Sequence, residues 1–176
     1  VSAVSGDSNA IGVQLEGGAG GVNFTNSGAI TATGVQLADG VFANSIGAAS
    51  ITNAAGGTIT ATADTWAAGI EAQSEDLTTV TNAGDITATA GAAGTGYGIY
   101  ATGFTGVTLA NSGSITANGY VAYGAVAEAK ASGAAISATN TGTIDVDTAG
   151  GALYAGGIVV KSVYENSGIV VNNGGE

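Results

Sequence analysis

The stretch "TNSGAITAT" at Thr25–Thr33 recurs in related form along the whole chain. The related stretches are "TNAAGGTITAT" at Thr52–Thr62, "TNAGDITAT" at Thr81–Thr89, "ANSGSITAN" at Ala110–Asn118, "TNTGTIDVD" at Thr139–Asp147 and "ENSGIVVN" at Glu165–Asn172. Their asparagines, which lie 27, 29, 29, 29 and 26 residues apart, are Asn26, Asn53, Asn82, Asn111, Asn140 and Asn166. A period in the twenties is typical of stacked repeat architectures.

Each repeat contains three short pieces with the apolar and polar alternation of a β-strand. One piece ends at the asparagine, as at Val22–Asn26, one is the "ITAT" piece, and one has the form "GI-x-A", as at Gly69–Ala72. Such pieces are too short for independent hairpins, and no segment has helical periodicity. We predict an all-β fold, a right-handed parallel β-helix (β-solenoid) of about six coils of 26–29 residues with three short strands per coil. Residues 1–176 are expected to form a single β-solenoid domain.

Aligned residues predict which side chains fill the interior. The isoleucines of the "ITAT" pieces are expected to share one inward column, because a β-branched side chain packs well on a pleated surface. These isoleucines are Ile30, Ile59, Ile86, Ile115, Ile144 and Ile169. The six asparagines are expected to form a structural ladder at a turn, in which each amide hydrogen-bonds to the asparagine of the next coil.

The composition excludes several classes of function. The chain has 13 acidic residues against only Lys130 and Lys161, a net charge of -11, and no cysteine. Phosphate recognition requires clustered basic residues, so nucleic acid is excluded as a partner. Without cysteine there are no disulfides and no thiolate metal sites. No stretch is long and apolar enough to cross a bilayer, so we expect no direct membrane insertion of this segment.

Chemistry-bearing residues are sparse. The chain has no histidine and no arginine, and the carboxylate pairs are Asp145 with Asp147 and Glu75 with Asp76. We interpret both pairs as solvated acids that keep an alanine-rich surface soluble, with weak calcium binding at Asp145 and Asp147 as the alternative. We therefore predict no enzymatic activity, no cofactor and no metal site, and keep a carbohydrate-active β-helix enzyme as an alternative function.

Two outward faces are candidate recognition surfaces. On the "ITAT" strands, pairs of threonines would form a grid with spacings of about 7 Å and 4.8 Å, and this grid consists of Thr31, Thr33, Thr60, Thr62, Thr87 and Thr89. The grid raises ice binding as an alternative function, although threonine is also an ordinary residue of exposed strands. On the "GI-x-A" strands, Phe42, Tyr100, Val126 and Val159 share an outward column with Glu71. Contiguous apolar side chains facing solvent mark a contact surface, and tyrosine is favoured at interfaces.

The stretches "TNSGAITATG" at 25–34, "NSGSITANG" at 111–119 and "GIYATG" at 98–103 resemble the passenger repeats of bacterial autotransporters. This resemblance implies a β-helix exported across both membranes of a Gram-negative bacterium and then secreted or displayed at the cell surface. It also implies a membrane β-barrel elsewhere in the full-length protein, so that this chain would be a fragment or processed part of a longer passenger. Passengers of this family act in adhesion, self-association, biofilm formation and enzymatic activity.

From these observations we expect an extracellular structural or adhesive β-solenoid module that mediates cell-surface adhesion or self-association, with filament or biofilm formation as a consequence. Its expected partners are copies of itself, in lateral or end-to-end contact, or molecules of a host or cell surface.

Overall fold

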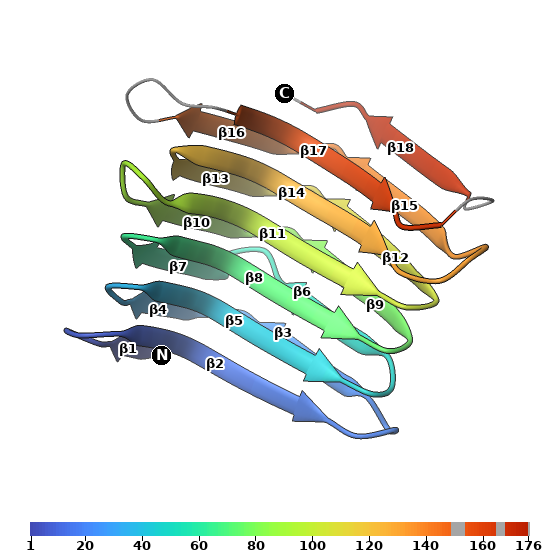
Figure 1. Ribbon diagram of the computed structural model, residues 1–176, viewed down its shortest axis with the longest axis horizontal. Coiled ribbons are helices and arrows are strands. Elements are labelled where there is room, and N and C mark those ends of the chain that lie inside the picture. Colours follow the sequence, from blue (N-terminus) through green and yellow to red (C-terminus); the bar gives the residue numbers. More distant parts are fainter. Residues whose placement is uncertain (149–153, 165–167, 176) are drawn as a thin grey trace.

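The computed structural model describes residues 1–148, 154–164 and 168–175. In this part of the chain, eighteen β-strands form three parallel sheets of six strands each, which confirms the predicted β-solenoid. Each of the six coils contributes one strand to each of the three sheets (Figure 1). We name the sheets A, B and C in the order in which the chain enters them within a coil.

The strands of each sheet follow one another along the stack (Figure 1). Sheet A consists of β1 (Ser2–Val4), β4 (Ala29–Thr33), β7 (Thr58–Ala63), β10 (Asp85–Ala90), β13 (Ser114–Gly119) and β16 (Thr143–Thr148). Sheet B consists of β2 (Asn9–Gly17), β5 (Leu37–Ser45), β8 (Trp66–Ser74), β11 (Thr95–Gly103), β14 (Val121–Ala129) and β17 (Tyr154–Ser162). Sheet C consists of β3 (Val22–Asn26), β6 (Ala49–Asn53), β9 (Leu77–Asn82), β12 (Gly106–Asn111), β15 (Ala135–Asn140) and β18 (Ile169–Asn173).

The core is a narrow tube of stacked columns. Ile59, Ile86 and Ile115 pair in register between sheet A strands and are at most 1% exposed. Beside them, small residues such as Ala61 of sheet A and Ala67 of sheet B pack in a separate alanine cluster. The alanines let the two sheets approach closely, so the tube is thin on that side.

The last coil corrects one expectation from the sequence. Ile169 does not continue the isoleucine column of sheet A, because it lies on β18 and pairs with Ile136 in sheet C. The strand that ends the fifth Asn-containing repeat, β16, already provides the last position of sheet A, where Ile144 pairs with Ile115. The stretch "IVVNN" of β18 is therefore equivalent to "VNFTN" of β3, and the "ENSGIVVN" phrase is not a sixth copy of the sheet A strand.

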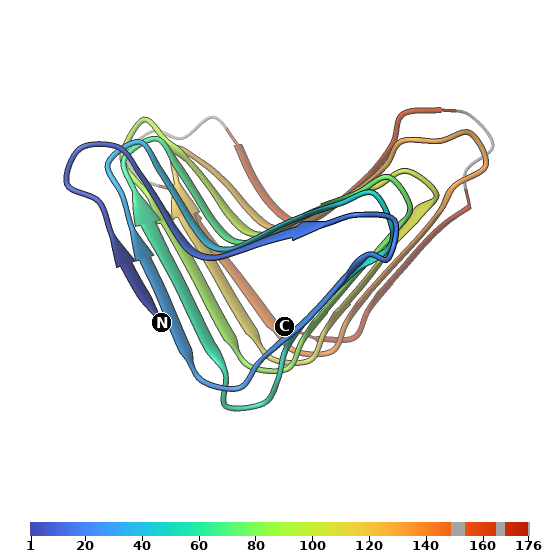
Figure 2. The same ribbon diagram turned by 90° about the horizontal axis from the view of Figure 1, so that it is seen from below.

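Sheet B is bent, and its outer face is concave (Figure 2). The fourth residue of every sheet B strand is a glycine. The residues on both sides of this glycine have register partners on the neighbouring strand, whereas the glycine itself has none. These glycines are Gly12, Gly40, Gly69, Gly98, Gly124 and Gly157. A Cβ atom on Gly69 would lie 2.6 Å from the carbonyl oxygen of Gly98 and also against Ile86 Cγ2. The close approach of neighbouring coils at the bend therefore requires glycine.

We expect the substitution Gly69→Ala to lower the free energy of unfolding by about 1–3 kcal/mol, because the new methyl group overpacks the core against fixed backbone. Gly157→Ala is the matched control, since Gly157 occupies the same column in coil six and a methyl group added there would meet no other atom within 4 Å. Its effect should stay within about 0.5 kcal/mol. Denaturant titration of both variants measures the difference, and equal losses would contradict the role of the bend.

Candidate functional site

The predicted column on sheet B is a continuous row in the structure. Phe42, Glu71, Tyr100, Val126 and Val159 are successive register partners on β5, β8, β11, β14 and β17. Phe42, Tyr100 and Val159 are partly exposed on the concave outer face. Val126, however, is only 7% exposed, so it supports its neighbours more than it offers surface of its own.

Aromatic rings gather beside this row. The Tyr97 ring stacks on the Tyr123 ring, with centroids 5.1 Å apart and an interplanar angle of 16°. Tyr97 also contacts Trp66 at 4.5 Å and Tyr100 at 5.2 Å, and Tyr123 contacts Tyr154 at 5.4 Å. The packed rings thus join coils three to six. We call this cluster the aromatic face, and it consists of Trp66, Tyr97, Tyr100, Tyr123 and Tyr154.

A shallow depression opens on the aromatic face, with a cavity volume of about 170 Å³. Its lining residues are Tyr97, Tyr100, Tyr123, Val126, Glu128, Val159 and Lys161. The Lys161 ammonium lies 3.6 Å from Glu128 Oε2 at its edge. The depression therefore combines ring surface with one charge of each sign.

Two carboxyl groups lie under the aromatic face, and sequence reasoning missed them as a pair. Asp39 is 2% exposed and Glu71 is 9% exposed. Burial, together with the neighbouring charge of Glu71, raises the pKa of Asp39 to about 7. Burial also raises the pKa of Glu71, although the amide of Gln73, which donates to Glu71 Oε1 at 2.6 Å, lowers it in part.

The Trp66 indole approaches these carboxyl groups closely enough to lower the pKa of both. It does so without completing a hydrogen bond, since Trp66 Nε1 and Asp39 Oδ1 are both buried and neither has a partner within hydrogen-bond geometry. A buried polar atom without a partner costs about 1–3 kcal/mol. The aromatic face therefore covers a polar centre that is poorly satisfied when it is charged.

The threonines lie in register on the outer side of sheet A. Thr31 pairs with Thr60 and Thr60 with Thr87, and the second row runs in the same way through Thr33, Thr62 and Thr89. Thr33 and Thr62 are exposed and the other four are partly exposed. The two rows continue into Asp145 and Asp147 on β16.

A ladder of asparagines runs along the stack at the end of sheet C. The donor Nδ2 of each asparagine reaches Oδ1 of the next at 2.7 to 2.9 Å, through Asn26, Asn53, Asn82, Asn111, Asn140 and Asn173. Asn166, the sixth position expected from the sequence, lies outside the described residues, and the ladder position in coil six is taken by Asn173, which pairs with Asn140. Each inner amide also donates to a backbone carbonyl of the adjoining turn, as Asn82 does to Gly84.

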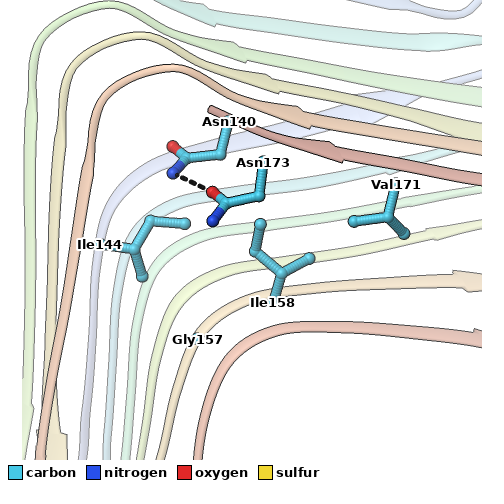
Figure 3. Close-up of a pocket in the computed structure, with 6 residues that line it drawn as sticks. All are labelled: Asn140, Ile144, Gly157, Ile158, Val171 and Asn173. Carbon is cyan, nitrogen blue, oxygen red and sulfur yellow. Dashed lines mark hydrogen bonds between the residues drawn. The ribbon is translucent and has the colours of Figure 1, made fainter. Parts of the chain in front are cut away.

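Coil six leaves the interior of the tube open at its end. The opening has a cavity volume of about 240 Å³ and is lined by Asn140, Ile144, Gly157, Ile158, Val171 and Asn173. Figure 3 shows the side chains of Ile144, Ile158 and Val171 around the end of the asparagine ladder. Apolar side chains that are buried in inner coils are accessible here.

The other acidic pairs do not gather into a site. Asp145 and Asp147 are exposed on β16, and Asp76 accepts a hydrogen bond from the Thr105 hydroxyl at 2.8 Å. Within residues 1–148, 154–164 and 168–175, no group of three or more His, Cys, Asp or Glu side chains could hold a metal ion. The same part of the chain contains no helix of the length and apolarity needed to cross a membrane.

The pKa of Asp39 predicts a pH-dependent stability. Because this pKa rises from 3.8 to about 7 on folding, the folded state keeps a proton that the unfolded chain releases. The contribution of this proton to the free energy of unfolding is fully present below the pKa that Asp39 has in the unfolded chain. It is lost as the pH rises through the pKa that Asp39 has in the folded protein. Asp39→Asn should therefore stabilise the protein by about 1–4 kcal/mol more at about pH 8 than at about pH 4. The control Asp85→Asn changes an exposed carboxylate, and an equal pH effect of both variants in thermal or denaturant unfolding would contradict the prediction.

Comparison of the chain with models of protein families, with curated proteins and with solved structures finds no match. The fold and its surfaces therefore rest on the contacts described above. Of these surfaces, the aromatic face and the threonine grid are those on which a function can rest.

Proposed function

We propose that this protein is an extracellular structural and adhesive β-solenoid module that mediates adhesion or self-association through the aromatic face. The observation that carries the proposal is the packed cluster of Trp66 and four tyrosines on the concave side of sheet B. Aromatic side chains at an accessible surface supply large contact area, and tyrosine and tryptophan are enriched at protein interfaces.

The scaffold favours binding to a partner surface over catalysis of a reaction. Tyr97, Tyr100 and Tyr123 are held by neighbouring rings and lie on strands that pair on both sides, so little side-chain entropy is lost when a partner binds. Burial raises the pKa of Tyr97 to about 12, and it also raises the pKa of Tyr100. Both phenols therefore remain protonated and can donate hydrogen bonds to a partner over the whole neutral range.

The resemblance of the repeats to autotransporter passengers supports a location at the surface of a Gram-negative bacterium or outside it. The absence of cysteine is compatible with that location. The partner of the aromatic face is then a second copy of the chain or a molecule of a neighbouring cell surface, and repeated contact of this kind leads to biofilm formation.

Ice binding is a second candidate, favoured by the register of the threonines. Two rows of three threonines lie side by side on the parallel strands of sheet A. Strand spacing and side-chain alternation give this grid a regular repeat of about 4.8 Å by 7 Å. A regular array of hydroxyl and methyl groups is the surface chemistry that such a function needs.

To test the aromatic face, Tyr100→Glu and Tyr123→Glu are combined in one variant, which places two charges on the cluster. We expect self-association to weaken about tenfold or more, because a charge at an interface core must be desolvated. Sedimentation velocity and the clustering of protein-coated beads measure the effect. Thr108→Glu adds a charge at an exposed position on sheet C and is the control; equal behaviour of the two variants would remove the proposal.

To test the grid, thermal hysteresis and ice shaping are measured in a cooled drop of the protein. If the grid binds ice, Thr62→Tyr should abolish both effects, because a bulky ring interrupts the flat array, whereas Thr108→Tyr on sheet C should leave them unchanged. A wild-type protein without hysteresis excludes this second function.

A further inference from the structure

We propose that the concave side of sheet B binds a neutral oligosaccharide, which spans the aromatic face and a second, polar depression at the edge of the same sheet. This inference rests on the proposed function in its adhesive form, because it names the class of surface molecule that the aromatic face contacts. The residues that carry it lie on, or directly after, strands β5, β8, β11 and β14, and each of these strands pairs with a neighbour on both sides.

The polar depression lies where these strands of sheet B end. It has a cavity volume of about 210 Å³, and its lining includes Asn44, Gln73, Glu75, Phe104 and Lys130. Asn44 and Gln73 are register partners on β5 and β8, and the other three residues directly follow β8, β11 and β14. The depression therefore combines two amides, a carboxylate, an ammonium and an aromatic ring.

The turns after the strands hold these side chains on ordered backbone. The Glu75 N–H donates to the Ser45 carbonyl at 3.0 Å, and the Phe104 N–H donates to the Ser74 carbonyl at 3.1 Å. The Phe104 carbonyl accepts the Ala131 N–H at 2.9 Å. Backbone pairing between coils thus continues past the strand ends, so a ligand has little backbone to order when it binds.

Polar groups of the depression are available to a ligand. In the part of the chain that the structure describes, the Lys130 ammonium and the Glu75 carboxylate have no ion pair, and both residues are exposed. The Gln73 amide donates one N–H to Glu71 Oε1, and such an amide has a second N–H and a carbonyl oxygen for further bonds. The depression offers both donors and acceptors, which suits sugar hydroxyls because each of them can donate and accept.

Along β11, the chain places an aromatic ring on each side of the outward column that contains Thr102 and its register partner Gln73. Tyr100 lies two residues before Thr102 and lines the depression of the aromatic face. Phe104 lies two residues after it, lines the polar depression and is 51% exposed. The C–H face of a sugar ring packs on such rings because both surfaces are apolar. Four residues of extended chain span roughly 13 Å, so a ligand that covers both rings is longer than one sugar.

Shape and charge favour a saccharide over a second copy of the chain. The outer side of sheet B is concave (Figure 2), and two concave faces leave a gap between them, whereas a slender chain of sugar rings can lie in the hollow. Two copies with a net charge of -11 each also repel one another. An acidic polysaccharide is repelled in the same way, and a neutral oligosaccharide is not.

A screen of the full chain tests the ligand class. The labelled protein is applied to an array of neutral oligosaccharides of glucose, galactose, mannose or xylose, printed beside oligogalacturonic acids. We expect binding to at least one neutral series. In that series a hexasaccharide should bind about tenfold or more tighter than a disaccharide, because only the longer chain reaches both rings. Isothermal titration calorimetry with the bound hexasaccharide then measures Kd.

Phe104→Ala tests the placement of the ligand. It should raise the Kd of the hexasaccharide about tenfold, because the apolar surface on which a sugar ring packs is lost. Val35→Ala is the control, since Val35 is 38% exposed, lies in the turn before β5 and lines neither depression. Circular dichroism melts establish that both variants fold, and equal Kd values for the two would contradict the placement.

The outcomes separate this inference from the proposed function. Absence of binding to every neutral oligosaccharide overturns the inference, as does binding to the acidic series alone. If the combined Tyr100→Glu and Tyr123→Glu variant still weakens bead clustering in that case, the proposed function stands with a protein as its partner. Hexasaccharide binding that is weakened by this variant and by Phe104→Ala, but not by Val35→Ala, supports the inference.

Discussion

Each coil of this protein depends on the next for its backbone hydrogen bonds. Strands of three to nine residues are too short to be stable alone, yet parallel pairing with the coils above and below satisfies their amides along the stack. The buried asparagines extend the same rule to side chains, since Asn82 is 0% exposed and both donates to and accepts from its neighbours in the ladder. Every other feature, including register, core and surface rows, follows from this requirement.

The demand for close stacking also shapes the outer surface. At the bend of sheet B only glycine fits against the isoleucine and the carbonyl of the next coil, as Gly69 does against Ile86 and Gly98. The bend turns the outer side of the sheet inward, so side chains that would stand apart on a flat sheet converge. Tyr97 and Tyr100 lie on either side of the bend glycine Gly98, and their ring centroids are 5.2 Å apart. A constraint of the interior thus creates the concave face on which the proposed contact depends.

The repeat period made the solenoid and its strands predictable from sequence, because five Asn-containing phrases in register leave few alternatives. Prediction failed where the period changed. The interval from Asn140 to Asn173 is 33 residues, so a phrase-by-phrase alignment assigned Asn166 to the ladder and Ile169 to sheet A. The pairing of Asp39 with Glu71 was also missed, because they occupy neighbouring columns on either side of the bend glycine, which strict period-2 alternation places on opposite faces. The function of the surfaces has no comparable sequence signal.

The aromatic face lies over Asp39 and Glu71, whose burial is costly once they ionise, and a partner that covered the face would remove more water from them. Burial raises the pKa of both carboxyl groups, so each keeps its proton to a higher pH than an exposed carboxyl group does. Rising pH therefore opposes the proposed contact at the aromatic face, because such a contact further buries carboxyl groups that are losing their protons. The proposed association is thus coupled to the ionisation of a pair that the fold itself has buried.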